Sequence, residues 1–404
     1  MLDALRSVLR FRSWEWDGAT RRLRGAASVD DLRRIARRRL PRGVFDYVDG
    51  GAEDERTMAA NRAAFGDVEF RPRVLRAVGE VETSTRLLGR PVPLPLILAP
   101  TGFTRIVDPQ GELAVARAAE RAGLPYALST MSTRSIEEVA EAAAAGRRWF
   151  QVYVWRDRGL VKELISRAAA AGYEALVITV DTAVLGRRER DVRRGFALPP
   201  KLGPGTLVDG ALHPAWTWAF LRNEPVAFAN VAGRSVGDGR DDAVALGGYV
   251  ARQFDPDLSW ADIEWFRANW DGAIVLKGIQ TVADAELAVE HGVEAVALSN
   301  HGGRQLDTAP APLRLVAPVA DAIGGRAEII CDGGVRRGSD IVKAVALGAT
   351  AAMVGRAYLY GLAAAGERGV DHVLAMLDDG VRRTMALVGA RSVDELTPDL
   401  VHHP

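Results

Sequence analysis

From about residue 94 onward, short apolar runs alternate with longer Ala-rich stretches in which apolar residues recur at helical spacing. This alternation is typical of successive βα units, which place parallel strands side by side under a layer of helices. Eight apolar runs are present, and nearly all end in a polar residue or glycine. The pattern predicts an α/β fold that closes into a (β/α)₈ TIM barrel. The predicted strands are 94–102, 125–130, 148–154, 175–181, 273–278, 295–300, 328–333 and 351–356.

Helical patterns occupy the stretches between these strands, and several of them end at glycine, which is the usual residue after a helix C-terminus. The predicted helices are 112–123, 135–145, 157–172, 259–270, 281–292, 312–323 and 339–348.

One connection breaks the rhythm. Between the fourth strand and the fourth helix the chain runs far beyond the few residues of an ordinary βα loop, which predicts a functional insertion at residues 186–258. Residues 1–80 have the pattern of helix and loop, and we expect them to form a short helical extension packed on a barrel of residues 81–404.

Composition narrows the class of protein. With 404 residues, of which 48% are apolar, the chain can bury one large core. Its 52 basic and 52 acidic residues balance, so no net field draws it to nucleic acid. The start has no apolar stretch of secretory type and no window could span a membrane, so we expect a cytoplasmic protein. The one cysteine, Cys331, lies in an apolar run and is expected to be a buried, inert thiol, with no metal site.

A polar cluster, LSNHGGRQLD, directly follows the sixth predicted strand and contains His301 and Arg304. Histidine is suited to taking a proton near neutral pH, and arginine can bind a carboxylate through two parallel hydrogen bonds. Asp181 ends the fourth strand, where it could hold an imidazole in one tautomer or merely cap a turn. The alternative for the first pair is a loop histidine and a surface charge.

Glycine and arginine follow the last two predicted strands, in CDGGVRRGSD (331–340) and VGRA (354–357). Glycine-rich turns at these two positions form the usual phosphate site of such barrels. Lys277, at the end of the fifth strand, needs an anionic partner. No GxGxxG follows a strand, which argues against a nicotinamide cofactor. A phosphate, a lysine and a histidine together suggest flavin mononucleotide (FMN), with its N1 side near Lys277.

Five motifs then carry a resemblance: FDYVDGGAEDE, LAPTGF, TVD followed by GRRERD, SNHGGRQLD and DGGVRRGSD. In this order the chain resembles, from about residue 28 to its end, the FMN-dependent L-2-hydroxy-acid oxidases and dehydrogenases, which include glycolate oxidase, mandelate dehydrogenase and L-lactate dehydrogenase. The resemblance implies that His301 is the catalytic base and that Asp181 orients it. It also implies that the substrate is held by Arg188, Arg304, Tyr47 and Tyr153.

On the cofactor side, the resemblance implies three groups of contacts. The flavin ring would be lined by the backbone of Pro100, Thr101 and Gly102 and hydrogen-bonded by Ser129, Gln151 and Thr179. Lys277 would stabilise the N1 and O2 edge, and Ser299 would contact the ribityl chain. The phosphate would be held by Asp332, Gly334, Arg336, Gly355 and Arg356.

Within the family, residues 207–231 resemble the corresponding loop of the membrane-associated bacterial dehydrogenases. Trp216, Trp218 and Phe220 lie near a basic run at 187–194 and either enter a bilayer surface beside a quinone or cover a subunit interface. The oxidases often carry alanine where Gly102 stands, and glycolate oxidase has an aromatic residue at the position of Met131. Both differences favour a dehydrogenase.

The expected reaction is therefore oxidation of L-lactate to pyruvate. Because no haem domain precedes the barrel, we expect a diffusing electron acceptor, a quinone first and oxygen second, at the inner face of the cell membrane or in the cytoplasm. L-Mandelate or a hydroxy-lactone such as L-pantolactone is the alternative substrate, and a catalytically inactive flavin-binding barrel is the alternative class. The resemblance also implies a homotetramer.

Overall fold

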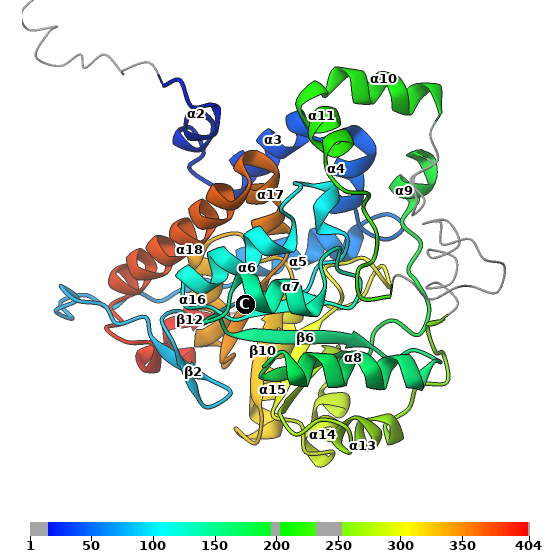
Figure 1. Cartoon of the computed structure of the whole chain (residues 1–404). Coiled ribbons are helices and arrows are strands. Elements are labelled where there is room, and N and C mark those ends of the chain that lie inside the picture. The colour runs from blue at the N-terminus through cyan, green and yellow to red at the C-terminus, as the bar shows by residue number, and fades with distance from the viewer. Residues whose placement is uncertain (1–14, 195–202, 232–252, 403–404) are drawn as a thin grey trace, which may run out of the picture.

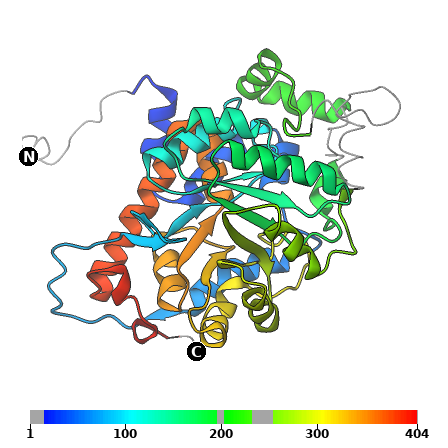
Figure 2. The same ribbon diagram turned by 60° about the horizontal axis from the view of Figure 1, so that its bottom comes forward.

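The computed structural model describes residues 15–194, 203–231 and 253–402. Its centre is a closed barrel of eight parallel strands that follow one another in chain order (Figures 1 and 2). The predicted TIM barrel is confirmed: each predicted run coincides with one barrel strand, and one of these strands extends a residue beyond its run. The strands are β4 Leu96–Leu98, β5 Tyr126–Ser129, β6 Arg148–Tyr153, β7 Ala175–Thr179, β8 Ala273–Ile279, β9 Ala295–Ser299, β10 Glu328–Asp332 and β11 Ala351–Val354.

The barrel interior is a packed core. Its inward-facing side chains are mostly alanine, valine and isoleucine, and Trp149 is the large member of the cluster. The antiparallel hairpin of β2 (Thr85–Leu87) and β3 (Arg90–Val92) adds Leu87 and Val92 to this cluster. The amino ends of the strands are thus covered, and the carboxyl ends are the face open to ligands.

Seven helices lie where the sequence predicted them, with ends that agree to within three residues, and they pack around the outside of the barrel. Side-chain caps explain several of their starts. Ser135 and Glu138 form a reciprocal capping box, and Thr281 accepts a hydrogen bond from Asp284 N. The helices are α6 Glu112–Arg121, α7 Ile136–Ala142, α8 Arg158–Ala170, α13 Ala261–Arg267, α14 Val282–Glu290, α15 Pro312–Ile323 and α16 Gly338–Ala346.

Two further helices complete the chain and were not among the predicted ones. They are α17 (Arg356–Ala365) and the long α18 (Glu367–Val388), which packs against both α17 and α16. Gly361 on α17 and Gly369 on α18 face each other so closely that a Cβ on either would overlap the other's backbone. Glycine is therefore required where these helices meet.

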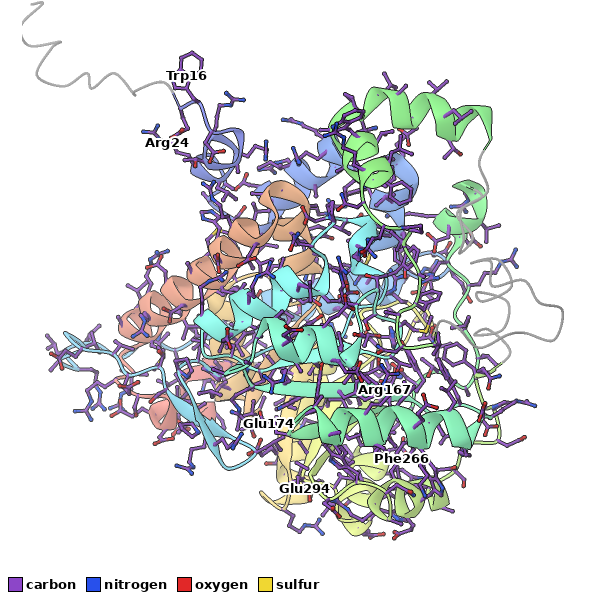
Figure 3. All side chains as sticks on the ribbon, viewed as in Figure 1. Trp16, Arg24, Arg167, Glu174, Phe266 and Glu294 are labelled. Carbon is purple, nitrogen blue, oxygen red and sulfur yellow. The ribbon has the colours of Figure 1, made fainter. Side chains whose placement is uncertain are left out.

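From residue 15 on, where the structure describes it, the N-terminal extension has four short helices: α2 Gly18–Arg24, α3 Val29–Arg39, α4 Arg42–Asp49 and α5 Arg56–Asp67. Helix α3 packs along α17, and the short strand β1 (Glu69–Phe70) pairs with β12 (Val401–His402) near the C-terminus. Just before α2, Trp16 projects away from the body of the molecule (Figure 3).

The described part of the predicted insertion forms three helices, α9 (Glu189–Arg194), α10 (Pro204–Leu212) and α11 (Pro214–Arg222). Helices α10 and α11 stand as a pair beyond the carboxyl face of the barrel, beside α4 (Figure 1). Residues 195–202 and 232–252 of the insertion, and the first 14 residues of the chain, lie outside the described residues. Among the helices that are described, none is long and apolar enough to cross a membrane.

Candidate active site

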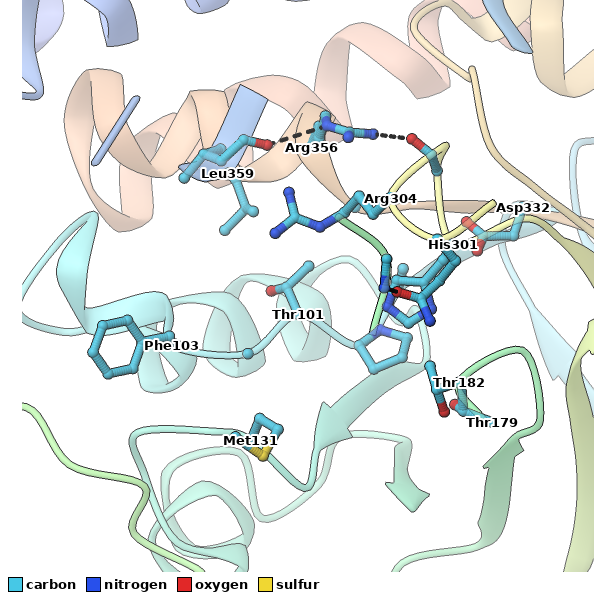
Figure 4. Close-up of a pocket in the computed structure, with 18 of the residues that line it drawn as sticks. Thr101, Phe103, Met131, Thr179, Thr182, His301, Arg304, Asp332, Arg356 and Leu359 are labelled. Atoms are coloured by element: carbon cyan, nitrogen blue, oxygen red, sulfur yellow. Dashed lines mark hydrogen bonds between the residues drawn. The ribbon is translucent and has the colours of Figure 1, made fainter. Parts of the chain in front are cut away.

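A cavity of about 490 Å³ opens at the carboxyl ends of the barrel strands, within the usual size range of ligand pockets. All but three of the site residues predicted from the sequence line it, and they come from the extension, the strand ends and the insertion. In Figure 4, Arg304 and Arg356 lie on one side of the pocket, Met131 on the opposite side, and Phe103 far from His301. The three predicted residues that do not line the cavity are Asp181, Ser129 and Ser299.

His301 and Asp181 come from neighbouring parts of the carboxyl face and meet as the sequence predicted. His301 Nδ1 lies 3.1 Å from Asp181 Oδ1, and the Asp181 side chain is almost fully buried. Burial raises the pKa of Asp181, but attraction and hydrogen bonding from His301, with a contribution from Lys277, outweigh it and lower the pKa overall. Asp181 is therefore an anion that favours a proton on Nδ1 and leaves Nε2 for chemistry.

The backbone at His301 is unusual, since its φ of 58° lies in the left-handed region. The two glycines that follow, Gly302 and Gly303, are also left-handed. A Cβ on Gly303 would lie 2.6 Å from the backbone nitrogen of Met58 in the extension. The glycines of the HGGR motif are thus needed because α5 packs directly against this loop.

The two arginines predicted to bind a carboxylate both face the cavity, with the ring of Tyr47 beside them. The guanidinium carbon of Arg188 lies 5.2 Å from the ring centre, and that of Arg304 lies 5.1 Å from it. Arg304 also donates to the carbonyl oxygens of Tyr47 (2.7 Å) and Gly50 (3.2 Å). Burial, followed by repulsion from Arg188, lowers the pKa of Arg304 to about 9. An anion bound beside both guanidiniums would offset that repulsion.

Tyr153 is the second predicted tyrosine, and it lies at the end of β6 with its ring edge-to-face against Phe254, at 5.2 Å between centres. Burial raises the pKa of its hydroxyl, so the group stays protonated and can donate a hydrogen bond into the cavity.

Lys277 finds its anionic partner within the protein. Its Nζ lies 2.6 Å from Asp332 Oδ2 and donates to Ser299 Oγ at 2.8 Å. Ser299 Oγ in turn donates to Asp332 Oδ2 and accepts from His301 N. Ser299 and Asp332 were predicted to contact the ribityl chain and the phosphate. In the structure both hold Lys277, because a buried ammonium requires a paired carboxylate, and their contacts with a cofactor stay a prediction.

Three of the predicted ring contacts form a hydrogen-bonded row across adjacent strands. Ser129 Oγ donates to Gln151 Oε1 at 3.1 Å, and Gln151 Nε2 donates to Thr179 Oγ1 at 3.0 Å. Gln151 and Thr179 line the cavity, whereas Ser129 lies behind them and fixes the orientation of the amide. Ser129 thus supports Gln151, and its predicted contact with a flavin ring stays a prediction.

The segment after β4 brings Pro100, Thr101 and Gly102 to the cavity wall, as predicted. Thr101 Oγ1 lies 2.6 Å from the hydroxyl of Tyr358, which donates to the carbonyl oxygen of Ala99. A Cβ added to Gly102 would lie 2.8 Å from Met131 Cβ. A residue larger than glycine would therefore clash here, because Met131 packs against the backbone of Gly102.

The last two strands end at the predicted phosphate site, where Gly334, Arg336, Gly355 and Arg356 line the cavity. Arg356 donates to the carbonyl oxygens of Val48, Gly50 and Gly302, and so also fastens the extension to this end of the barrel. Arg336 Nε is buried and lacks a hydrogen-bond partner among the described residues. An unpaired buried guanidinium nitrogen beside a glycine-rich helix start fits a bound phosphate group, so the residues present fit FMN.

Sequence reasoning missed several residues of this site. Asp191 Oδ2 lies 2.9 Å from Arg188 Nε, and its spacing of three residues in GRRERD was the available signal. Gln305, inside the quoted SNHGGRQLD motif, donates to the carbonyl oxygens of Asp181 and Val184. Phe228 and Phe254 line the cavity from distant segments of the insertion, and no motif or spacing pointed to them.

The structure places the predicted aromatic residues of the insertion in different surroundings. Trp216 is partly buried against the barrel core, and its Nε1 donates to the carbonyl oxygen of Ile106 at 2.7 Å. Trp216 therefore fastens α11 to the barrel and is not free to enter a bilayer. Trp218 is 59% exposed, with the guanidinium of Arg222 over its ring.

Comparison with known proteins agrees with this geometry. A family model described as FMN-dependent dehydrogenase matches residues 36–403. A putative L-lactate dehydrogenase of Mycobacterium tuberculosis is 47% identical over 394 residues, covering 98% of this chain and 93% of the relative. An L-lactate oxidase of a Nostoc species is 41% identical, covering 92% and 97%. Among solved structures, the monotopic membrane protein (S)-mandelate dehydrogenase superposes with a TM-score of 0.90 at 39% identity, covering 94% of this chain and 100% of that one.

Proposed function

We propose, from the premise that this chain belongs to the FMN-dependent dehydrogenase family, that its substrate is L-lactate and its product pyruvate. Membership of the family makes the chain an FMN-dependent enzyme that oxidises an L-2-hydroxy acid. The choice of lactate is supported by relatives at 41–47% identity, several of which are L-lactate dehydrogenases.

One observation carries the chemistry: the His301–Asp181 pair opens onto the same cavity as Arg188 and Arg304. In our proposal the two arginines bind the substrate carboxylate, and the hydroxyls of Tyr47 and Tyr153 orient the substrate. His301 Nε2 removes a proton, and the buried Asp181 anion stabilises the imidazolium that forms. The two electrons released by the oxidation are accepted by FMN, which supplies the redox chemistry when bound.

The residues that would hold FMN divide into contacts and supports. The ring contacts we propose are Pro100, Thr101, Gly102, Gln151, Thr179 and Lys277, and the phosphate contacts are Gly334, Arg336, Gly355 and Arg356. Ser129 keeps Gln151 in place, while Ser299 and Asp332 keep Lys277 in place. Held in this way, the Lys277 ammonium would stabilise the negative charge that the flavin ring gains on reduction.

For the electron acceptor we propose a membrane quinone. The support is the exposed apolar surface of α10 and α11, where Leu212 is 69% and Leu221 72% exposed, together with the monotopic nature of the structurally similar mandelate dehydrogenase. Oxygen is the second candidate, since one relative is an L-lactate oxidase. The assembly we expect is a homotetramer, to be measured by size-exclusion chromatography with light scattering.

The test is an anaerobic titration of the purified holoenzyme with L-lactate while the flavin absorbance is recorded, using D-lactate as the control. Bleaching by the L isomer alone supports the proposal, whereas bleaching by L-mandelate or L-pantolactone but not by L-lactate overturns the choice of substrate. Admitting air, or a soluble quinone under argon, to the reduced enzyme then separates the acceptors by the rate at which colour returns. His301→Ala should stay yellow and lose turnover by about 10²-fold or more.

A further inference from the structure

Two of the arginines in the segment 186–194 have different surroundings. Arg188 lines the cavity, whereas Arg190 is not among the lining residues and lies against the extension. Arg190 Nη1 donates to Asp49 Oδ2 at 3.0 Å and lies 3.7 Å from Asp46 Oδ1, and Arg190 Nη2 forms an ion pair with Glu55. One guanidinium thus joins the start of the insertion to three carboxylates of the extension.

Two of these carboxylates are held in place by groups other than Arg190. Asp49, whose side chain is 2% exposed, accepts from Arg33 Nε at 2.5 Å and Nη2 at 2.8 Å, and from the hydroxyl of Tyr360 at 2.7 Å. Glu55 accepts from Gly51 N at 2.9 Å. Asp49 and Glu55 therefore form an acceptor site that does not depend on Arg190 for its position. By binding to that site, Arg190 can hold the segment 186–194 in place.

The other end of the segment is fastened to the His301 loop. Gly186 N donates to Gln305 Oε1 at 3.0 Å, and Gly186 packs so closely on the backbone of Arg304 and Gln305 that a Cβ would overlap both. Between the two ends, Arg188 is held by Asp191 and by the ring of Tyr47. The position of Arg188 relative to Arg304 therefore depends on anchors at both ends.

We infer that Arg190 is a positioning residue for binding of the substrate carboxylate: through Asp49 and Glu55 it fixes Arg188 at the distance from Arg304 that a carboxylate requires. The inference rests on the proposed function, because it needs the two arginines to be the carboxylate site. Without Arg190, the segment would keep the backbone bond from Glu53 N to the Arg187 carbonyl oxygen, at 3.0 Å, but would lose its ion pairs with Asp49 and Glu55. Small displacements of a positioning group weaken binding strongly.

The experiment compares Arg190→Gln with Arg193→Gln in the holoenzyme. Arg193 lies on the same helix and is 69% exposed, and its ion-pair partner among the described residues is Glu189, one turn away. For Arg190→Gln we expect a KM for L-lactate raised roughly ten-fold or more with kcat within about two-fold, since the carboxylate contact is shared by ground and transition states. Oxalate, followed by its perturbation of the flavin absorbance, should bind more weakly by a similar factor. Arg193→Gln should behave as wild type.

Two further variants keep the inference falsifiable. Arg190→Lys keeps the charge and should recover part of the loss, and Glu55→Gln, which removes the partner, should raise KM in the same direction without changing Arg190. A KM and an oxalate affinity unchanged in both Arg190→Gln and Glu55→Gln would overturn the inference, as would a loss confined to kcat. If another L-2-hydroxy acid, and not L-lactate, reduces the wild-type flavin, the proposed substrate fails but the same comparison is made with that acid.

Discussion

The extension and the insertion both lie outside the barrel and both reach the active cavity, but they are attached in opposite ways. The extension contributes buried polar contacts. Asp49 receives hydrogen bonds from three different elements, Arg356 donates to two carbonyl oxygens of α4 and its following turn, and Asp307 of the His301 loop accepts from the start of α5. The insertion contributes a few anchors, such as Trp216, and otherwise exposes apolar side chains on α10 and α11.

The difference shows two ways in which added segments complete a barrel site. Buried ion pairs and hydrogen bonds fix geometry, because an unpaired partner in a dry environment is costly. Exposed apolar groups fix nothing within the monomer and are instead available to a surface outside it. The extension is therefore expected to stabilise the fold and to hold the start of the insertion, whereas α10 and α11 are expected to determine which outside surface the enzyme binds.

The largest effect should come from removing the centre of the extension's polar contacts. In Asp49→Ala the partly exposed guanidiniums of Arg33 and Arg190 lose a buried partner, and we expect the free energy of unfolding to fall by about 2–3 kcal/mol. Urea unfolding of the holoenzyme measures it. The matched control is Asp209→Ala in the insertion, which removes one hydrogen bond from Arg42 N and should cost about 1 kcal/mol. Equal losses in the two variants would contradict the comparison.

The fall in unfolding free energy at acid pH should also depend on the extension, through Asp49. Burial opposes ionisation of Asp49, but Arg33 and Tyr360, with Arg190, lower its pKa to about 2. Because the folded pKa lies below the unfolded value of about 3.9, the carboxylate stabilises the fold above that value and its contribution is lost as the pH falls towards 2. Asp49→Asn should therefore flatten the fall in unfolding free energy between about pH 4 and 2 by about 2 kcal/mol. An unchanged acid limb would show that Asp49 is already neutral.

A smaller effect is expected at the start of α5. Glu55 stands at the N-cap with a left-handed φ of 62° and makes no capping bond of its own, and Asp307 accepts from Arg56 N and Thr57 N instead. Asp307→Ala should cost about 1 kcal/mol, the usual value of a lost cap, with turnover at saturating substrate little changed. Asp307→Asn keeps an acceptor and serves as the control. A loss equal in both variants would mean that charge, and not the hydrogen bond, holds the helix.

The sequence predicted the barrel well because each strand is a buried apolar run bounded by polar residues, and that signal is local. The site residues followed from motifs, but their partners did not. Nothing in the order of residues shows that Asp332 faces Lys277 or that Ser299 lies between them, since strands β8, β9 and β10 bring these residues together only when the sheet closes. Nor does helical spacing say which aromatic ring of 214–222 turns inward, so the packing of Trp216 against the barrel could not be predicted.

The smallest effect on the fold should come from the insertion's exposed apolar residues. Leu212 and Leu221 stay largely exposed in the folded protein and bury little apolar area. The double variant Leu212→Ser with Leu221→Ser should therefore change the unfolding free energy by no more than about 0.5 kcal/mol. Turnover with a soluble dye as acceptor should stay at the wild-type value, because neither residue lines the cavity. Co-sedimentation with anionic phospholipid vesicles should fall, and so should turnover with a membrane-bound quinone. The reason is that the substitutions remove apolar side chains that would be buried in the lipid.

The double variant Leu287→Ser with Leu387→Ser, at exposed positions elsewhere on the barrel, is the control. Equal vesicle binding by both double variants and the wild type would assign the apolar face of α10 and α11 to a subunit interface, where dilution should then shift the oligomeric state.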